Sequence, residues 1–173
     1  MTDGSSLNAI GGCPDSSQAA ALAGVMDDDG AMADAVEIRR WESRDRDRVQ
    51  ALLRLLSEDA LVSSHDAPTY VAETQGEVVG TVTLCVFTTL TGRKAYLDHL
   101  VVAPAWRQRG IGRALMEHAI QQARAAGASR IDLTADAQKQ AGHALYRALG
   151  FRERDTNNFR LEFTSEESQA ASG

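Results

Sequence analysis

Apolar positions recur along the chain with two different periods. Runs that alternate between apolar and polar residues, or that are continuously apolar, predict strands, because the side chains of a strand point to opposite faces in turn. Such runs occupy residues 36–39, 69–74, 78–90, 93–103 and 130–134. Apolar residues spaced three or four apart predict helices instead. Helices are expected after Ser43, over about 57–62, after Gly112 and over about 141–149.

The order of these elements predicts how they connect. Gln75-Gly76-Glu77 and Thr91-Gly92 are typical of tight turns, so residues 69–103 are expected to form an antiparallel meander of three strands. The long helix that follows is a crossover connection, which makes the strand at 130–134 parallel to the strand before it. Residues 150–154 and 158–163 are expected to add a closing hairpin.

Residues 103–115 join the third strand of the meander to the long helix. Pro104 ends the apolar run, since proline cannot donate a hydrogen bond within a sheet, and Gly110 and Gly112 lie where the helix begins. The first N–H groups of a helix have no partner within it, and the helix dipole adds a partial positive charge there. Three arginines surround this turn: Arg107, Arg109 and Arg113. The glycines let an anion approach the backbone, so a pyrophosphate is the expected ligand.

Two common pyrophosphate-binding motifs do not fit this turn. A Walker loop ends in Gly-Lys followed by Ser or Thr, and the sequence contains no such ending. A dinucleotide-binding fingerprint needs Gly or Ala three residues after its second glycine, where this chain has Leu115. Nucleoside triphosphate chemistry and nicotinamide binding are therefore both disfavoured. Taken alone, the turn is also compatible with arginines that are merely solvated.

Two segments resemble a known family. The pattern Arg-x-x-Gly-x-Gly, formed by Arg107, Gly110 and Gly112, resembles the acyl-CoA signature of the GNAT superfamily of N-acetyltransferases. Residues 144–151, Ala-Leu-Tyr-Arg-Ala-Leu-Gly-Phe, resemble the Leu-Tyr-x-x-x-Gly-Phe segment that closes this fold. The two segments occur in the family's order with one predicted strand between them, and the resemblance covers about residues 36–163.

The resemblance implies a fold and a division of the chain. The expected fold class is α/β (α+β): a single GNAT-type domain over residues 35–163, with a mixed, mostly antiparallel sheet of six to seven strands. A splayed central strand pair and about four flanking helices complete this domain. Residues 1–34 contain no Lys or Arg and are rich in Gly, Ser, Ala and Asp. They and residues 164–173 are expected to form disordered tails.

The resemblance also implies which residues hold the coenzyme. The strands that end at Ala103 and begin near Arg130 are expected to separate, which leaves backbone groups that the pantetheine arm uses as a substitute strand. On this interpretation, the N–H near Leu100 holds the thioester carbonyl and Val102 binds the pantetheine amide. The residues implied for coenzyme binding are Leu100, Val101, Val102, Arg107, Gln108, Arg109, Gly110, Ile111, Gly112, Arg113 and Ala114.

Tyr146 and Asp98 are the predicted catalytic residues. Tyr146 matches the family tyrosine whose hydroxyl reaches the coenzyme sulfur, so the resemblance implies a general acid, and a phenol keeps its proton at neutral pH. Regular strand alternation would place Asp98 on the face of Leu100 and His99 on the other face, which favours Asp98 as the general base. His99 and His143 remain alternatives, and a substrate-binding or structural role stays open for each.

Composition limits the partners. The formal net charge of −6 at pH 7 argues against nucleic acid, which is bound by a broad basic surface. No apolar run is long enough to cross a membrane. Cys13 and Cys85 lack the spacing of a disulfide or a metal site, which suits a cytoplasmic protein that binds no metal. Homodimers are common among similar proteins, and the sequence leaves the oligomeric state open.

The expected function is that of an acyltransferase. It would move an acetyl group from acetyl-CoA to a primary amine by direct transfer. Two alternatives stay open: a non-catalytic acyl-CoA-binding regulatory module, and a transferase for a longer acyl group. The sequence does not identify the acceptor amine, which variable loops such as residues 63–68 are expected to contact.

Overall fold

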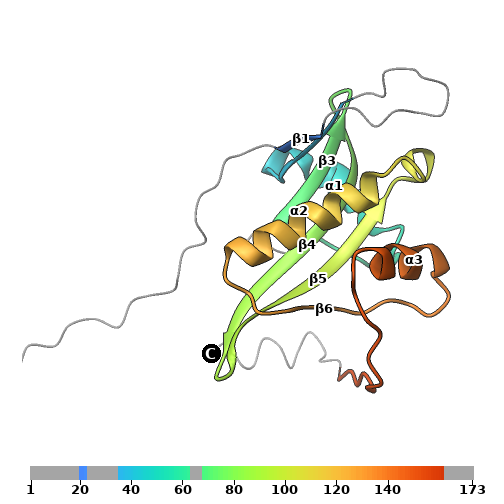
Figure 1. Cartoon of the computed structure of the whole chain (residues 1–173). Coiled ribbons are helices and arrows are strands. Elements are labelled where there is room, and N and C mark those ends of the chain that lie inside the picture. Colours follow the sequence, from blue (N-terminus) through green and yellow to red (C-terminus); the bar gives the residue numbers. More distant parts are fainter. Residues whose placement is uncertain (1–19, 23–34, 63–67, 162–173) are drawn as a thin grey trace, which may run out of the picture. The chain divides into compact units, whose positions relative to one another are not determined.

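The computed structural model describes residues 20–22, 35–62 and 68–161. Its main feature is a six-stranded sheet in which the strands follow one another in chain order (Figure 1). The strands are β1 (Ala20–Leu22), β2 (Val36–Arg40), β3 (Thr69–Thr74), β4 (Glu77–Thr89), β5 (Gly92–Val102) and β6 (Ile131–Leu133). Neighbouring strands are antiparallel except β5 and β6, which are parallel. The predicted mixed, mostly antiparallel sheet is confirmed.

The chain divides into two compact units, one ending at Gln138 and one beginning at Lys139. Among the described residues, the first unit contains the sheet and two α-helices, and the second contains one α-helix. The helices are α1 (Arg46–Leu53), α2 (Ile111–Ala125) and α3 (Gln140–Ala148), with two 3-10 turns, η1 (Ser43–Asp45) and η2 (Pro104–Trp106).

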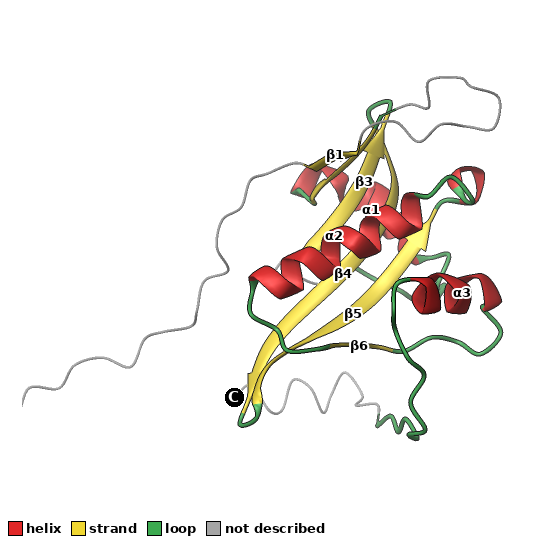
Figure 2. Ribbon diagram, viewed as in Figure 1, coloured by secondary structure: helices red, strands yellow, loops and turns green. Residues whose placement is uncertain are grey.

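In the first unit, α1 and α2 cover opposite faces of the sheet (Figure 2). The buried cluster on the α1 face consists of Trp41, Val49, Leu52, Leu53, Val71, Val78 and Val101. Thr81 pairs with both Val71 and Val101 and so lies on the α1 face. A side chain on the preceding residue, Gly80, would therefore point to the α2 face. A Cβ atom there would lie 3.0 Å from Cδ1 of Leu115 on α2. Glycine at this position lets the helix approach the sheet closely.

The long helix α2 follows directly from its sequence pattern. Its buried residues are Ile111, Ala114, Leu115, Met116, His118, Ala119 and Ala123, which form the predicted apolar stripe. After the helix, Gly127 has φ 76°, and the N–H of Ala128 donates to the carbonyl of Ala123. This left-handed glycine ends α2 at the predicted position.

Two predicted elements are not formed in the described residues. Residues 57–62 form no helix: residues 58–59 make a turn and the rest is irregular. The side chain of Gln50 on α1 binds the carbonyl of Ala60 and the N–H of Val62, which holds this segment to α1. Residues 151–161 have no regular secondary structure, so the predicted closing hairpin is absent there. The exposed polar residues 152–158 offer no apolar face that a sheet could bury. The last two residues of the predicted hairpin, 162–163, lie outside the described residues.

The first strand, β1, lies within residues 1–34, which the sequence analysis assigned to a tail. It pairs antiparallel with β2 through Ala20 with Ile38 and Leu22 with Val36. The other residues of this segment lie outside the described residues, and so do Cys13 and residues 63–67. The loop predicted to contact the acceptor therefore has only Pro68 in the described part.

Strand β5 departs from regular alternation at His99. Its register with β4 pairs Asp98 with Thr83 but Val101 with Thr81, so β5 has one residue more than β4 between these pairs. His99 also has a left-handed backbone, with φ 53°. Both features define a β-bulge. Thr83 and Thr81 lie on one face of β4, and paired residues share a face, so Asp98 lies on the same face as Val101. The prediction that Asp98 shares a face with Leu100 is therefore wrong.

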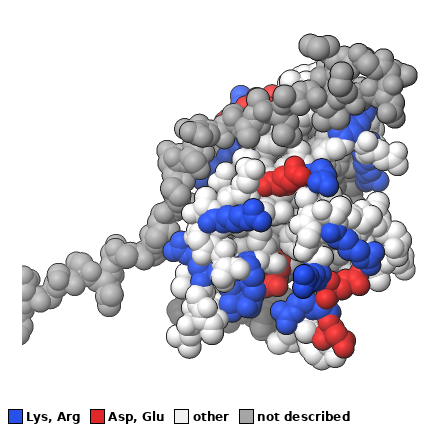
Figure 3. Space-filling model, in the orientation of Figure 1, with Lys and Arg blue, Asp and Glu red and all other residues white. Residues whose placement is uncertain are grey.

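The basic residues belong to the described part of the chain. All 18 Lys and Arg residues lie between Arg39 and Arg160. Figure 3 shows basic side chains on the face that carries α2, some of them beside acidic side chains. Because residues 1–34 contribute only negative charge to the net −6, the folded part is more basic than the whole chain.

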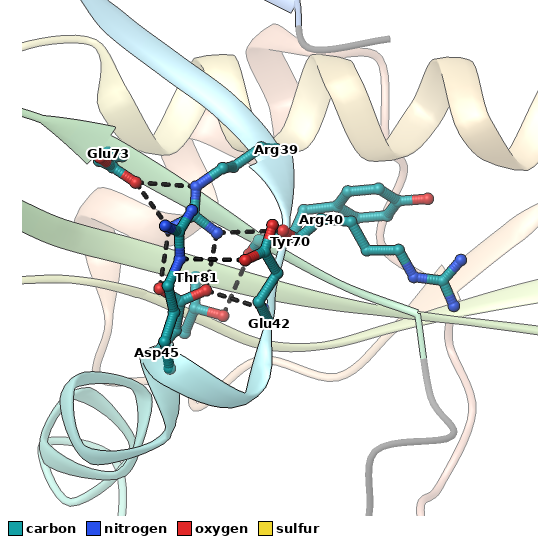
Figure 4. A network of polar contacts seen from close by, with 8 residues as sticks. Arg39, Arg40, Glu42, Asp45, Tyr70, Glu73 and Thr81 are labelled. Carbon is teal, nitrogen blue, oxygen red and sulfur yellow. Dashed lines mark hydrogen bonds and ion pairs between the residues drawn. The ribbon is translucent and has the colours of Figure 1, made fainter. Parts of the chain in front are cut away.

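Arg39 on β2 connects the sheet to the start of α1 (Figure 4). Its two terminal nitrogens donate to the two carboxylate oxygens of Asp45 at 2.7 and 2.8 Å, and its Nε donates to Glu73 of β3 at 2.8 Å. Asp45 also accepts the N–H of Glu42 at 2.8 Å. Burial alone raises the pKa of Asp45, but the hydrogen bonds from Arg39 and Glu42 outweigh it and hold that pKa below its usual value.

Asp45→Asn is expected to reduce the free energy of unfolding at pH 7 by about 1.5 kcal/mol, because charge-assisted hydrogen bonds to a buried carboxylate are lost. The pKa of Asp45 is lower in the folded chain than in the unfolded chain, so this contribution is complete above the unfolded value. It disappears as pH falls through the folded value. Urea denaturation should therefore show the two proteins converging in stability below about pH 4. Asp47→Asn, at an exposed site on α1, is the control, and an equal effect of both variants would contradict the prediction.

Candidate active site

The strands β5 and β6 pair over a short stretch and then separate. The pairs are Ala95 with Ile131, Tyr96 with Asp132 and Leu97 with Leu133. Beyond Leu97, β5 continues to Val102, and no β6 residue pairs with this part within the described chain. Figure 1 shows the two strands diverging. The splayed strand pair implied by the resemblance is confirmed, with β6 as the edge strand of the described sheet.

Among the strands that the structure describes, none pairs with one side of the main chain at the end of β5. The N–H of Ala103 donates to the carbonyl of Val79, next to β5 on the β4 side, at 2.8 Å. Peptide groups of successive strand residues point to opposite sides, so those of Val102 point toward the gap left by β6. The Val102 carbonyl accepts a hydrogen bond from Nε of Arg107 at 3.1 Å. By the same alternation, the peptide groups of Leu100 also point toward this gap.

The turn between β5 and α2 presents main-chain N–H groups. Gln108 and Gly110 have left-handed backbones, with φ 63° and 78°, and Gly110 is the residue that precedes α2. The first helical hydrogen bond runs from Ala114 to the carbonyl of Gly110 at 3.0 Å. Within the described residues, the N–H groups of Ile111, Gly112 and Arg113 have no hydrogen-bond partner. A left-handed non-glycine residue such as Gln108 is uncommon and often marks a ligand-binding segment.

The three arginines of this turn make contacts that are individually weak. Arg107 binds the Val102 carbonyl, and the guanidinium of Arg109 lies 4.8 Å from the centre of the Trp106 ring. Arg113 pairs with Glu117 one turn later on α2, at 3.0 Å. Exposed contacts of this kind contribute about 0.5–1 kcal/mol each, so the guanidinium groups can turn toward an anion at little cost.

Asp98 and His99 interact with each other at the bulge. The Oδ1 atom of Asp98 accepts the N–H of His99 at 2.8 Å, and its Oδ2 lies 3.7 Å from Nε2 of His99. Both side chains are about half exposed. On the same face, burial and then the charge of Asp98 raise the pKa of the Cys85 thiol. A thiol with a raised pKa is a poor nucleophile, which agrees with the prediction that Cys85 is not catalytic.

The second unit holds Tyr146 on α3. A Cβ atom on Gly142 would lie 3.6 Å from Cε2 of Tyr146, so the ring packs over this glycine. The ring also makes an edge contact with Phe151, with centroids 6.1 Å apart. Burial raises the pKa of the Tyr146 phenol above its usual value. As predicted, the left-handed Gly150 ends the helix, and the N–H of Phe151 then donates to the Tyr146 carbonyl.

His143, the other alternative for the base, lies on α3 beside Glu153. Its Nδ1 is 3.5 Å from Oε1 of Glu153, which also accepts Arg147 at 2.6 Å. The hydrogen bond from Arg147, and to a smaller extent the one from His143, lowers the pKa of Glu153. His118 is buried on α2 against the Tyr70 ring, and desolvation lowers its pKa.

Two contacts near the proposed site were not identified from the sequence: the packing of Gly142 under Tyr146 and the contact of Arg109 with Trp106. The first has a visible signal, a glycine one turn before a helical tyrosine.

The described residues form neither a metal site nor a helix that could cross a membrane. They contain no group of three or more His, Cys, Asp or Glu side chains that could hold a metal ion. Within the same residues, no helix combines the length and the apolar character that crossing a bilayer requires.

The comparison with protein families decides the family. A model described as the acetyltransferase (GNAT) family matches residues 33–151. The chain belongs to the GNAT acetyltransferase family. The GNAT match contains both sequence motifs, the turn before α2 and the Tyr146 segment.

Curated relatives of this GNAT protein include two N-acetyltransferases. The chain is 38% identical over 106 residues to N-acetyltransferase family 8 member 3 of Rattus norvegicus, a match that covers 60% of this chain and 46% of that protein. It is 38% identical over 60 residues to the ribosomal protein bS18-alanine N-acetyltransferase of Escherichia coli (strain K12), covering 35% of this chain and 40% of that protein. The chain thus spans less than half the length of each of these relatives.

Among solved structures, the GNAT fold is shared with an aminoglycoside N-acetyltransferase in complex with CoA. The TM-score is 0.65 at 15% sequence identity, and the match covers 76% of this chain and 97% of that chain. At this level of identity, the likeness concerns the fold.

Proposed function

We propose that this protein is an acyltransferase that moves an acetyl group from acetyl-CoA to a primary amine by direct transfer. The observation that carries the proposal is the gap between β5 and β6 beside the start of α2, where the N–H groups of Ile111, Gly112 and Arg113 lack partners within the described residues. A thioester arm and a diphosphate need these two features side by side. Family membership and the CoA complex of a protein with the same fold support it.

The main chain would bind the coenzyme. The peptide groups of Leu100 and Val102 would pair with the amides of the pantetheine arm, which takes the place of a neighbouring strand. The Val101 side chain would keep this strand in place by packing in the α1 cluster. The remaining residues of the proposed coenzyme site surround the diphosphate: Arg107, Gln108, Arg109, Gly110, Ile111, Gly112, Arg113 and Ala114. Helix N-termini and arginines bind diphosphates through main-chain N–H groups and charge-assisted hydrogen bonds.

The proposed reaction is a single displacement at the thioester. The neutral amine attacks the acetyl carbon, the new carbon–nitrogen bond forms, the carbon–sulfur bond breaks, and the amine loses one proton. The N–H of Leu100 would stabilise the negative charge on the carbonyl oxygen. Tyr146 would donate its phenolic proton to the departing thiolate, and its raised pKa keeps this proton in place at neutral pH. The amine proton would pass to water. Regular alternation favoured Asp98 as the base, but the bulge at His99 places Asp98 on the face of Val101 and not on that of Leu100.

The acceptor of this chain is proposed only as an amine. By their names, one relative acts on the alanine of a ribosomal protein and the enzyme that shares the fold acts on aminoglycosides. Both acceptors present an amino group, although their remaining chemistry differs. Cys13 and Cys85 lack the spacing of a disulfide or a metal site, which supports a reducing, cytoplasmic setting for the reaction.

The test is thiol release from acetyl-CoA with a panel of primary amines. The panel contains amino acids, polyamines, an aminoglycoside and peptides that begin with alanine, and mass spectrometry identifies the acetylated product. Amine-dependent release supports the proposal, whereas tight CoA binding in calorimetry without turnover would favour the regulatory module. Acyl-CoAs of increasing chain length then separate acetyl transfer from transfer of a longer acyl group.

A further inference from the structure

The bulge in β5 reverses the direction in which its main-chain groups point. The N–H of Ala95 donates to the carbonyl of Arg130, the residue before β6, whereas the N–H of Ala103 donates to the carbonyl of Val79 on the β4 side. In a regular strand, residues an even number apart point to the same side. The extra residue at His99 therefore turns the later part of β5, so that the peptide groups of Leu100 and Val102 point to the gap.

The bulge requires a backbone that histidine does not favour. His99 has φ 53°, a left-handed conformation that most residues with a Cβ atom avoid because of steric crowding. It is stabilised by the preceding side chain, since Oδ1 of Asp98 accepts the N–H of His99 at 2.8 Å. Asp and Asn side chains often hydrogen-bond to nearby main-chain N–H groups in turns in this way.

We propose that Asp98 is a positioning residue, which holds the His99 bulge and thereby directs the main chain of Leu100 and Val102 toward the coenzyme. This inference rests on the proposed function, in which these two residues bind the thioester and the pantetheine arm. The role requires a hydrogen-bond acceptor at Oδ1 and does not require a base. Asparagine can supply the same acceptor, and it cannot take a proton from the amine.

Two substitutions in the full chain separate positioning from base catalysis. Asp98→Asn should keep CoA affinity within about threefold of the wild type, and Asp98→Ala should weaken it about tenfold, the effect of losing one main-chain hydrogen bond. Calorimetry with CoA alone measures both affinities. With an amine that the wild type acetylates, Asp98→Asn should also keep kcat and the acidic limb of the pH profile. A general base would instead make Asp98→Asn lose about a hundredfold or more in kcat.

A rescue and a control complete the design. Adding His99→Gly to Asp98→Ala should restore most of the lost affinity, because glycine adopts the left-handed backbone without a side-chain clash. Asp132→Ala removes a carboxylate from the neighbouring strand β6 opposite Tyr96, where β5 and β6 still pair regularly, and should leave CoA affinity unchanged. Equal losses in Asp98→Asn and Asp98→Ala, or no loss in Asp98→Ala, would overturn the proposal.

A measurement without coenzyme keeps this inference separate from the proposed function. Hydrogen exchange followed by NMR should show the His99 amide protected in the wild type and in Asp98→Asn, and exchanging faster in Asp98→Ala. Equal exchange in all three proteins would show that Asp98 does not hold the bulge. Failure of the wild type to bind CoA would overturn the proposed function, and the exchange rates would still decide whether Asp98 stabilises the bulge.

Discussion

Replacing Tyr146 by phenylalanine is expected to lower kcat by about a hundredfold or more, the typical contribution of a general acid. The Kd for CoA should change by less than about threefold, because the ring and its packing over Gly142 and against Phe151 are retained. Only the hydroxyl is lost, and the departing thiolate then has no proton donor from this side chain. Steady-state kinetics and calorimetry with the same preparation measure the two effects.

The pH dependence gives a second readout for Tyr146. Burial raises the phenol pKa, so the proton is retained through neutral pH and is lost only above the usual value of about 10. The wild-type rate should therefore fall only in strongly alkaline solution, and this limb should be missing in Tyr146→Phe. The matched control is Tyr70→Phe on β3, whose ring packs against His118. An unchanged kcat in Tyr146→Phe, or an equal loss of kcat and CoA affinity, would remove the acid role.

Gly112→Val is expected to weaken CoA binding about thirtyfold, which corresponds to about 2 kcal/mol of lost anion binding. Gly112 lies in the first turn of α2, and its N–H has no partner among the described residues. A branched side chain beside this N–H would keep a diphosphate away from the backbone. The helix should remain intact, because Gly112 lies outside the left-handed region and valine has a higher helix propensity than glycine.

Calorimetry with CoA and thermal unfolding followed by circular dichroism test this prediction together. Ala125→Val provides the control, since it adds a branched side chain at the exposed last residue of the same helix. The control should bind CoA like the wild type. An affinity in Gly112→Val equal to that of the wild type would show that the start of α2 does not hold the coenzyme.

Local signals in the sequence predicted the elements around the proposed coenzyme site well. Pro104 ends β5 within two residues, Gly110 has the left-handed backbone that precedes α2, and Gly127 and Gly150 end the two later helices. Such positions are predictable because the conformational limits of proline and glycine depend on the residue itself and on its immediate neighbours.

Other features depended on partners distant in the sequence. Residues 57–62 were predicted as a helix, but the side chain of Gln50 binds their main chain and holds them in a non-helical conformation. The ion network of Arg39 joins β2, η1 and β3, and nothing in the local pattern around Arg39 indicated it. Neither interaction leaves a periodic signal, because each joins segments that meet only in the folded chain.

By itself, the sequence determined the strand–turn–helix that starts α2, the basic and glycine-rich character of that turn, and the family to which the chain is similar. Only the tertiary structure decided how β5 is registered against β4, and so which main-chain groups face the gap beside β6. The physical reason is that a bulge is a property of two paired strands. One extra residue, His99, reverses every later peptide group, and only the pairing with β4 shows which residue is the extra one.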